Sequence, residues 1–65
     1  MKKVKTHKGF SIYQRTQKEL DKAAAENLLL CEFEIYLPDE SPTELCSPEW
    51  EADSLKECID FLADR

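Results

Sequence analysis

The stretch of sequence that decides the fold is SLKECIDFL, residues 54–62. Ser54 and Glu57 form the Ser-x-x-Glu pattern of an N-terminal capping box. Behind this cap, four apolar side chains recur at the spacing i, i+3, i+4 and i+7, which places them on one face of an α-helix: Leu55, Cys58, Ile59 and Leu62. The pattern predicts a helix over residues 54–64 whose apolar face must be covered by another apolar surface.

Residues 28–37, LLLCEFEIYL, are expected to supply that surface, because their side chains alternate between the two sides of an extended chain. One side is apolar and comprises Leu29, Cys31, Phe33, Ile35 and Leu37. The other side is mostly polar and comprises Leu30, Glu32, Glu34 and Tyr36. The alternation predicts the longest strand of the chain, which ends at Pro38 and lies at the centre of a sheet with one solvent-exposed face.

The N-terminal residues predict a β-hairpin with strands at about residues 2–6 and 10–15. A three-residue loop ending at Gly9 would put this glycine where the backbone needs a positive φ. A two-residue loop would instead place Val4 opposite Tyr13 and scatter the apolar side chains over both sides. We therefore predict the three-residue loop, which gathers three apolar side chains on one side of the hairpin: Val4, Phe10 and Ile12.

Two shorter elements complete the chain. Residues 16–19, TQKE, form a second capping box before an alanine-rich stretch and predict a short helix between strands. The sequence leaves open whether residues 16–27 are a stable helix or a mobile insertion. After the long strand, residues 38–48 predict an acidic loop, and residues 49–52 predict a short edge strand with two inward-pointing side chains, Trp50 and Ala52.

Together these elements predict an α+β fold in a single domain over residues 1–65. We expect a three- to four-stranded antiparallel sheet, with the C-terminal helix packed on one face and a short helical insertion between strands. Tyr13, Leu30 and Tyr36 are then expected on the other, exposed face of the sheet. The predicted core comprises Val4, Phe10, Ile12, Leu29, Phe33, Ile35, Leu37, Trp50, Leu55, Ile59 and Leu62.

Size and charge exclude several classes of function. A chain of 65 residues buries only about 60% of its unfolded surface, so a large catalytic cleft is not expected. The net charge of -5 argues against a protein whose whole surface binds nucleic acid or anionic lipid. The charge is uneven, however, because residues 1–22 hold seven of the nine basic side chains and only two of the fourteen acidic ones.

The sequence also predicts the compartment. The basic N-terminus is not followed by the apolar stretch of a secretory signal, and the longest aliphatic run, residues 28–31, is far shorter than the ~20 residues that span a bilayer. Three cysteines without paired spacing do not indicate a disulfide framework. We expect a soluble cytoplasmic protein with reduced thiols and no contact with membranes.

No pattern of residues indicates chemistry. Cys31, Cys46, Cys58 and His7 include no Cys-x-x-Cys or His-x-x-x-His pair of the kind found in zinc sites. A catalytic cysteine needs a neighbour that lowers its pKa, and the charged residues close to these cysteines in sequence are mainly acidic. We therefore predict a protein that is not an enzyme and has no catalytic residue, metal, cofactor or small-molecule substrate.

Three segments resemble a type of small uncharacterised bacterial protein, often encoded on phages or other mobile elements. They are residues 8–10 (KGF) entering a strand, residues 32–36 (EFEIY) in a second strand, and residues 50–61 (WEADSLKECIDF) leading into a helix. Such proteins join a β-meander to one C-terminal helix, and the insertion of residues 16–27 departs from that pattern. The resemblance implies a fold and no activity.

The predicted function is therefore binding. We expect a non-enzymatic accessory or inhibitor module that docks on a protein partner or on a second copy of itself, through the outer sheet face and the acidic 38–51 segment. One alternative is nucleic-acid binding by the basic N-terminal ribbon, because the preferred register predicts one continuous exposed patch of Lys3, Lys5, Tyr13 and Arg15. The other is mimicry of DNA by the acidic residues. The candidate interaction surface comprises Lys3, Lys5, Tyr13, Arg15, Tyr36, Glu32 and Glu34.

Overall fold

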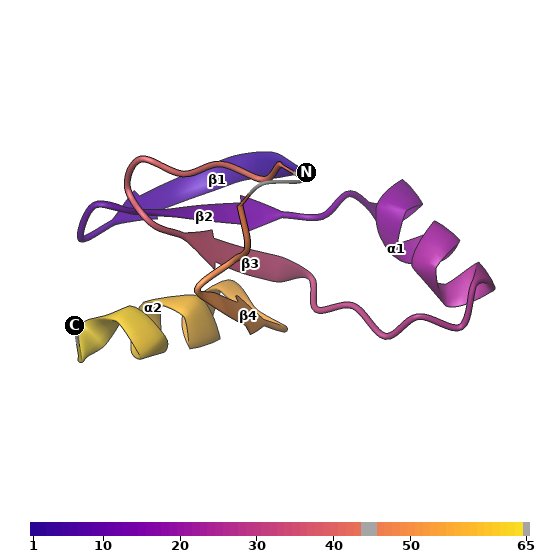
Figure 1. Ribbon diagram of the computed structural model, residues 1–65. Helices are drawn as coiled ribbons and strands as arrows, with labels where there is room; N and C mark the ends of the chain where they lie inside the picture. The colour runs from indigo at the N-terminus through magenta and orange to yellow at the C-terminus, as the bar shows by residue number, and fades with distance from the viewer. Residues whose placement is uncertain (44–45, 65) are drawn as a thin grey trace.

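The computed structural model describes residues 1–43 and 46–64 and confirms the α+β architecture. Its four strands form one antiparallel sheet in the order β1-β2-β3-β4, and a helix lies between β2 and β3 (Figure 1). The C-terminal helix packs on the sheet. The elements are β1 (Lys2–His7), β2 (Phe10–Gln14), α1 (Gln17–Ala25), β3 (Phe33–Tyr36), β4 (Trp50–Ala52) and α2 (Leu55–Ala63).

The core lies between α2 and the sheet face that it covers. Cys58 and Leu62 of α2 have no exposed surface, and neither do Ile12 of β2 and Ile35 of β3. Phe33 and Ala52 complete this cluster of buried residues. The predicted helix face and the apolar side of the predicted central strand therefore meet. The partly buried side chains packed around them are Phe10, Leu55 and Phe61.

Ser54 caps the N-terminus of α2 as its sequence predicts, but the second half of the predicted capping box differs. The backbone N–H of Glu57 donates to Oγ of Ser54 at 3.2 Å. The carboxylate of Glu57 accepts from the backbone N–H of Asp53 at 3.0 Å, one residue before the cap. At the other end of α2, Nζ of Lys8 donates to the carbonyl of Ala63 at 3.0 Å, where a cation is favoured by the helix dipole.

The hairpin register differs from the prediction, because the turn has two residues and not three. His7 pairs with Phe10, and Lys8 and Gly9 have φ angles of 52° and 86°. Two positive φ angles are the signature of a type I′ turn, whose twist suits a two-residue hairpin. The register then shifts between Lys3 and Lys5, which indicates a β-bulge.

This register removes Val4 from the core. Val4 lies in the irregular part of β1, which pairs only with β2, and its side chain is 39% exposed. The prediction that Val4 joins the core was wrong. The reason is that the lysine in the turn adopts the left-handed region, which allows a loop of two residues. The shorter loop forms even though the longer one would gather the apolar side chains on one side.

The predicted long strand is also shorter, because β3 begins at Phe33. Helix α1 ends in a Schellman motif: the N–H of Leu28 donates to the carbonyl of Ala23, the N–H of Asn27 donates to that of Ala24, and Asn27 has φ 60°. Leu28 therefore terminates the helix and does not start a strand. Leu29, which was predicted to be in the core, is fully exposed.

The edge strand β4 forms, but Trp50 is not buried. Ala52 pairs with Phe33 and is buried, whereas Trp50 pairs with Ile35 and is 50% exposed. One face of the indole stacks on Phe61 of α2, with ring centroids 4.6 Å apart and an angle of 9° between the planes. Trp50 thus points toward α2, as predicted. It lies at the rim of the core and not inside it, because β4 is an edge strand of the sheet.

Helix α1 is a formed helix with both halves of its capping box in place. The N–H of Glu19 donates to Oγ1 of Thr16, and the N–H of Thr16 donates to Oε1 of Glu19, both at 3.1 Å. The N-terminal ammonium of Met1 lies 2.9 Å from the same carboxylate. Figure 1 shows α1 standing apart from the sheet, at the end of the molecule far from α2. Neither helix has the length or the apolar character that crossing a bilayer requires.

The cap of α2 leads to a stability prediction. Ser54→Ala should lower the free energy of unfolding by about 1 kcal/mol, because the N–H of Glu57 loses its acceptor. Ser54→Asp keeps an acceptor at the N-cap and should stay within about 0.5 kcal/mol of the wild type. Urea unfolding measures both variants, and equal losses in the two would contradict the capping role.

Candidate functional site

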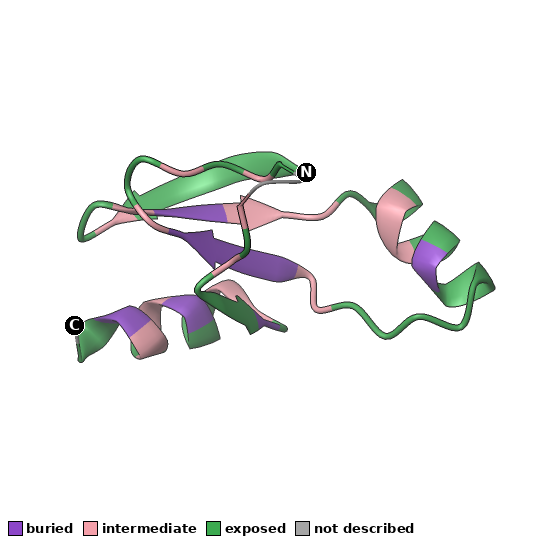
Figure 2. Cartoon of the chain, viewed as in Figure 1, coloured by how far each residue is buried: buried purple, intermediate pink, exposed green. Residues whose placement is uncertain are grey.

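The sheet face opposite α2 was predicted to be exposed, and for Glu34 and Tyr36 this prediction was wrong. Strand alternation places Ser11, Glu34 and Tyr36 on this face, yet Glu34 is only 4% exposed and Tyr36 only 3%. Figure 2 shows β3 buried along its whole length. In Figure 1 the described part of the β3–β4 connection passes over β1 and is then drawn across β2 and β3. Both faces of the sheet are therefore used for packing.

Glu34 is the centre of a polar cluster on this buried face. Its Oε2 accepts a hydrogen bond from Nη2 of Arg15, and its Oε1 accepts one from the hydroxyl of Tyr36 at 2.8 Å. Nε of Arg15 also donates to the carbonyl of Cys31 at 3.0 Å. The ring of Tyr13 meets that of Tyr36 edge-on, with centroids 5.5 Å apart. Because a buried carboxylate is tolerated only when paired, this cluster stabilises the fold and does not form a free surface.

Glu51 lies at the margin of the same cluster. Its Oε1 is 3.9 Å from Nη2 of Arg15, and its register partner in β3 is Glu34. A hydrogen bond with Glu34 raises the pKa of Glu51, and burial and the charge of Glu34 add to this effect. Burial and the hydrogen bond to Glu34 also raise the pKa of Tyr36. The cluster thus contains two carboxylates and one guanidinium, which leaves Glu51 incompletely paired.

The predicted basic patch is divided between the two faces of the sheet. Lys3 pairs with Tyr13, whereas Lys5 pairs with Ile12, so the two lysines lie on opposite sides of the hairpin. Arg15 is half-buried in the Glu34 cluster. The prediction that Lys3, Lys5, Tyr13 and Arg15 form one continuous exposed patch was wrong, because the bulge in β1 shifts the alternation by one residue.

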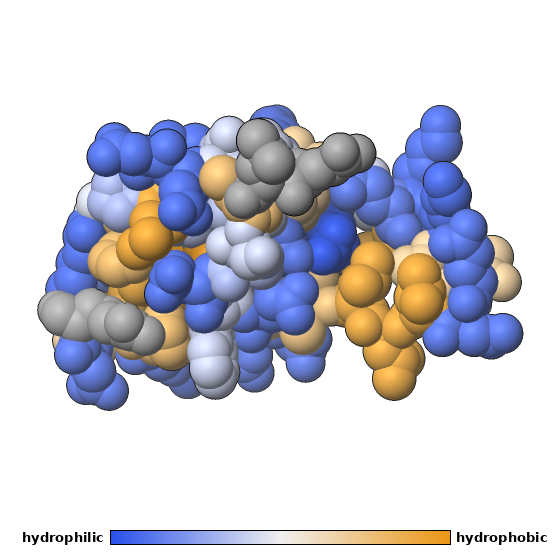
Figure 3. Space-filling model, viewed as in Figure 1, coloured by the Kyte–Doolittle hydropathy of each residue, from blue (hydrophilic) through white to orange (hydrophobic). Residues whose placement is uncertain are grey.

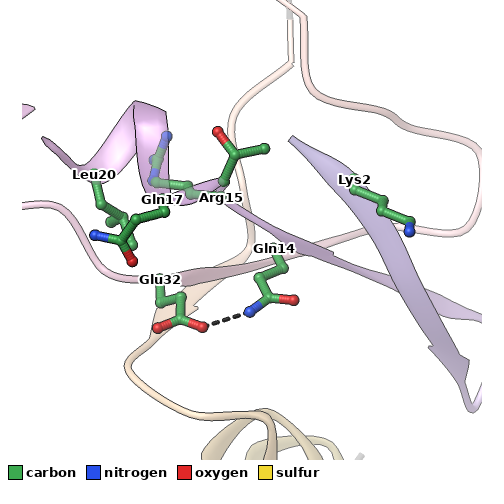
Figure 4. Close-up of a pocket in the computed structure, with 7 residues that line it drawn as sticks. Lys2, Gln14, Arg15, Gln17, Leu20 and Glu32 are labelled. Carbon is green, nitrogen blue, oxygen red and sulfur yellow. Dashed lines mark hydrogen bonds between the residues drawn. The ribbon is translucent and has the colours of Figure 1, made fainter. Parts of the chain in front are cut away.

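Glu32, the last predicted surface residue, lines a cavity of about 280 Å³ beside β2 and the start of α1 (Figure 4). Nε2 of Gln14 donates to Oε2 of Glu32. Lys2 and Leu20 line the same cavity, and Arg15 also borders it. The carboxylate of Glu32 and the guanidinium of Arg15, which both line the cavity, are thus already paired within the protein.

The thiols of Cys31 and Cys58 do not have the properties of nucleophiles. Burial raises the pKa of Cys58, which lies in the core, and the charge of Glu57 raises it further. Burial, followed by the charge of Asp53, raises the pKa of Cys31. Thiols with raised pKa values stay protonated at neutral pH. Among residues 1–43 and 46–64, no group of three or more His, Cys, Asp or Glu side chains is arranged to hold a metal ion.

One exposed feature was missed by the sequence analysis. Leu28 and Leu30 are about half exposed, and Leu29 between them is fully exposed; we call residues 28–30 the leucine arm. Figure 3 shows apolar side chains gathered between the body of the molecule and α1. The signal that could have revealed the arm is the Ala-Glu-Asn-Leu end of the helix, because Asn at a helix end followed by an apolar residue is typical of the Schellman motif.

Comparison with protein-family models, with curated proteins and with solved structures found no match to this chain. The resemblance to small phage-type proteins therefore stays a prediction. The function has to be inferred from the surfaces of the molecule itself.

The incomplete pairing of Glu51 leads to a pH-dependent prediction. Because its pKa in the folded protein is raised, the protonated form stabilises the fold below the unfolded pKa of about 4.5, and that contribution is lost as the pH rises through the folded pKa. Glu51→Gln, which cannot ionise, should therefore be more stable than the wild type at pH 7. The gain should be less than about 1 kcal/mol, since the side chain is 46% exposed.

Urea unfolding at pH 7 and at pH 4 measures this difference. The gain from Glu51→Gln should shrink or vanish at pH 4, where Glu51 itself becomes protonated. Glu49→Gln is the matched control, because Glu49 is exposed and its substitution removes the same charge from a nearby position. A loss of stability in Glu51→Gln at pH 7, or the same gain in both variants, would contradict the account.

Proposed function

We propose that this protein is a non-enzymatic binding module, an accessory or inhibitor protein that docks on a protein partner through the leucine arm. The observation that carries the proposal is the full exposure of Leu29 between two half-exposed leucines. Single exposed apolar side chains are ordinary on a protein surface, but a contiguous apolar group is typical of a contact site.

The arm is held in place before any partner arrives. At its N-terminal end, the N–H of Leu28 is bonded to the carbonyl of Ala23 at 2.8 Å. Just beyond its C-terminal end, the carbonyl of Cys31 accepts from Arg15, which is itself fixed by Glu34. A backbone anchored at both ends loses little conformational freedom on binding. More of the free energy of the apolar contact therefore contributes to the affinity.

The surroundings of the arm suit a protein partner. Helix α1, which precedes the arm, mixes basic and acidic side chains, so no strong field of one sign surrounds the leucines. Apolar contacts at the centre with mixed charges at the rim are the usual composition of a protein interface. A second copy of the chain is one form of this partner, because a near-neutral rim lets two copies meet despite the net charge of -5 on each.

The alternatives are supported less well. Nucleic-acid binding was predicted from a continuous basic patch, and Lys3 and Lys5 lie on opposite faces. Mimicry of DNA needs carboxylates arrayed on the surface, whereas Glu34 is buried and paired with Arg15.

The proposal predicts that Leu29→Ser weakens partner binding about 10- to 100-fold, the loss expected when a leucine no longer buries its side chain. The variant should unfold at the same urea concentration as the wild type, because Leu29 makes no buried contact. Light scattering over a concentration series tests binding to a second copy, and capture followed by titration of the recovered protein tests other partners.

Val4→Ser is the matched control, because Val4 is an exposed apolar side chain on a different part of the surface. It should bind like the wild type. A wild-type protein that stays monomeric and recovers no partner would overturn the proposal. So would a partner that binds Leu29→Ser and the wild type equally well.

A further inference from the structure

Strand β1 is an open edge of the sheet. It pairs only with β2, and its residues Lys2 to Thr6 are all exposed. Among residues 1–43 and 46–64, no backbone hydrogen bond joins β1 to a segment other than β2. The opposite edge is different, because β4 has only three residues and one of them, Ala52, is buried. β1 is therefore the longer edge beside which an extended segment of another chain can add to the sheet.

The turn determines which backbone groups of β1 face outward. His7 and Phe10 flank the two-residue turn and form a hydrogen-bonded pair, so the next pair, Thr6 with Ser11, is not hydrogen-bonded. The N–H and C=O of Thr6 consequently point away from β2, toward the open edge. These are the groups that an added strand would bind.

The charges of β1 determine what kind of strand would fit. Lys3 lies on the Tyr13 side of the hairpin and Lys5 on the Ile12 side, so the edge presents ammonium groups on both faces of the sheet. Two copies of β1 side by side would place lysines next to lysines, and this repulsion disfavours self-pairing. A duplex of nucleic acid needs its cations on one surface, whereas an added strand projects side chains to both faces.

We propose that β1 accepts an extended acidic segment of a protein partner as a fifth strand. Backbone hydrogen bonds to Thr6 hold the segment, and carboxylates on its two faces pair with Lys3 and Lys5. This surface is separate from the leucine arm and does not depend on it. Lysines on an edge strand also protect a sheet from aggregation, and that role alone predicts no binding of any segment.

The probe is a fluorescent, end-capped ten-residue peptide of glutamate and valine whose glutamates fall on both faces when it is extended. Fluorescence anisotropy with the wild-type protein at 50 mM salt should show saturable binding that weakens at 300 mM salt. The same peptide with N-methyl groups on alternate amides keeps its charge but cannot pair along an edge. It should bind at least tenfold more weakly.

Variants test the contacts. Lys3→Gln and Lys5→Gln should each weaken binding about two- to fivefold, the range for one cross-strand ion pair. Thr6→Pro removes the outward N–H and should weaken it at least tenfold, whereas Thr6→Val keeps this N–H and should bind like the wild type. Circular dichroism checks that each variant is folded. Leu29→Ser should bind the peptide normally, which separates this surface from the leucine arm.

Three results would overturn the proposal. The first is no binding of the acidic peptide, which leaves protection against aggregation as the role of the lysines. The second is equal binding of the N-methylated peptide, which would mean ionic attraction without strand addition. The third is tighter binding of a labelled DNA or RNA oligonucleotide of the same length than of the peptide, which would favour the nucleic-acid alternative.

Discussion

The contact on which the rest of the structure depends is that of Cys58 and Leu62 with Ile12 and Ile35, four side chains without any exposed surface. They join the last helix to the two central strands, which are far apart in sequence. In a chain of 65 residues there is little other apolar area to bury, so this contact holds the sheet together and sets where α2 lies. The side chains that this contact does not bury form the surfaces that are available for binding.

The second face of the sheet shows how a small protein uses polar side chains where a second apolar layer is lacking. Glu34 is buried, but Arg15 and Tyr36 satisfy both of its carboxylate oxygens. From the alternation of residues 28–37 alone, Glu34 has the pattern of a solvent-facing residue. Its burial accompanies its pairing with Arg15, which follows β2, and no local pattern within residues 28–37 indicates this partner.

Small shifts in register decide which side chains can act together. A two-residue turn at Lys8 and Gly9, followed by a bulge, moves Lys5 to the opposite face from Lys3. In the predicted register, the lysines of β1 lie on one face and would form a surface for nucleic acid. In the observed register, they lie on both faces of the edge strand. Likewise, the Schellman end of α1 turns residues 28–30 from the start of a strand into an exposed arm. In both places, the conformation of one or two residues with positive φ changes what the surface can bind.

The sequence alone determined the elements and the fold class, because capping boxes, the 3.6-residue period and strand alternation act between residues that are close together in the chain. It therefore indicated both helices, the apolar face of α2 and the strands that this face covers. Only the tertiary structure decided that Glu34 and Tyr36 are inside, that Val4 and Leu29 are outside, and that the lysines of β1 are divided. Those outcomes depend on the turn conformation, the bulge, the Schellman end of α1 and the pairing of Glu34 with Arg15. The turn and the helix end are local conformations that the alternation of apolar residues does not distinguish. The bulge and the Glu34–Arg15 pair join segments that are distant in sequence, and no short stretch of sequence contains the free energies of such contacts.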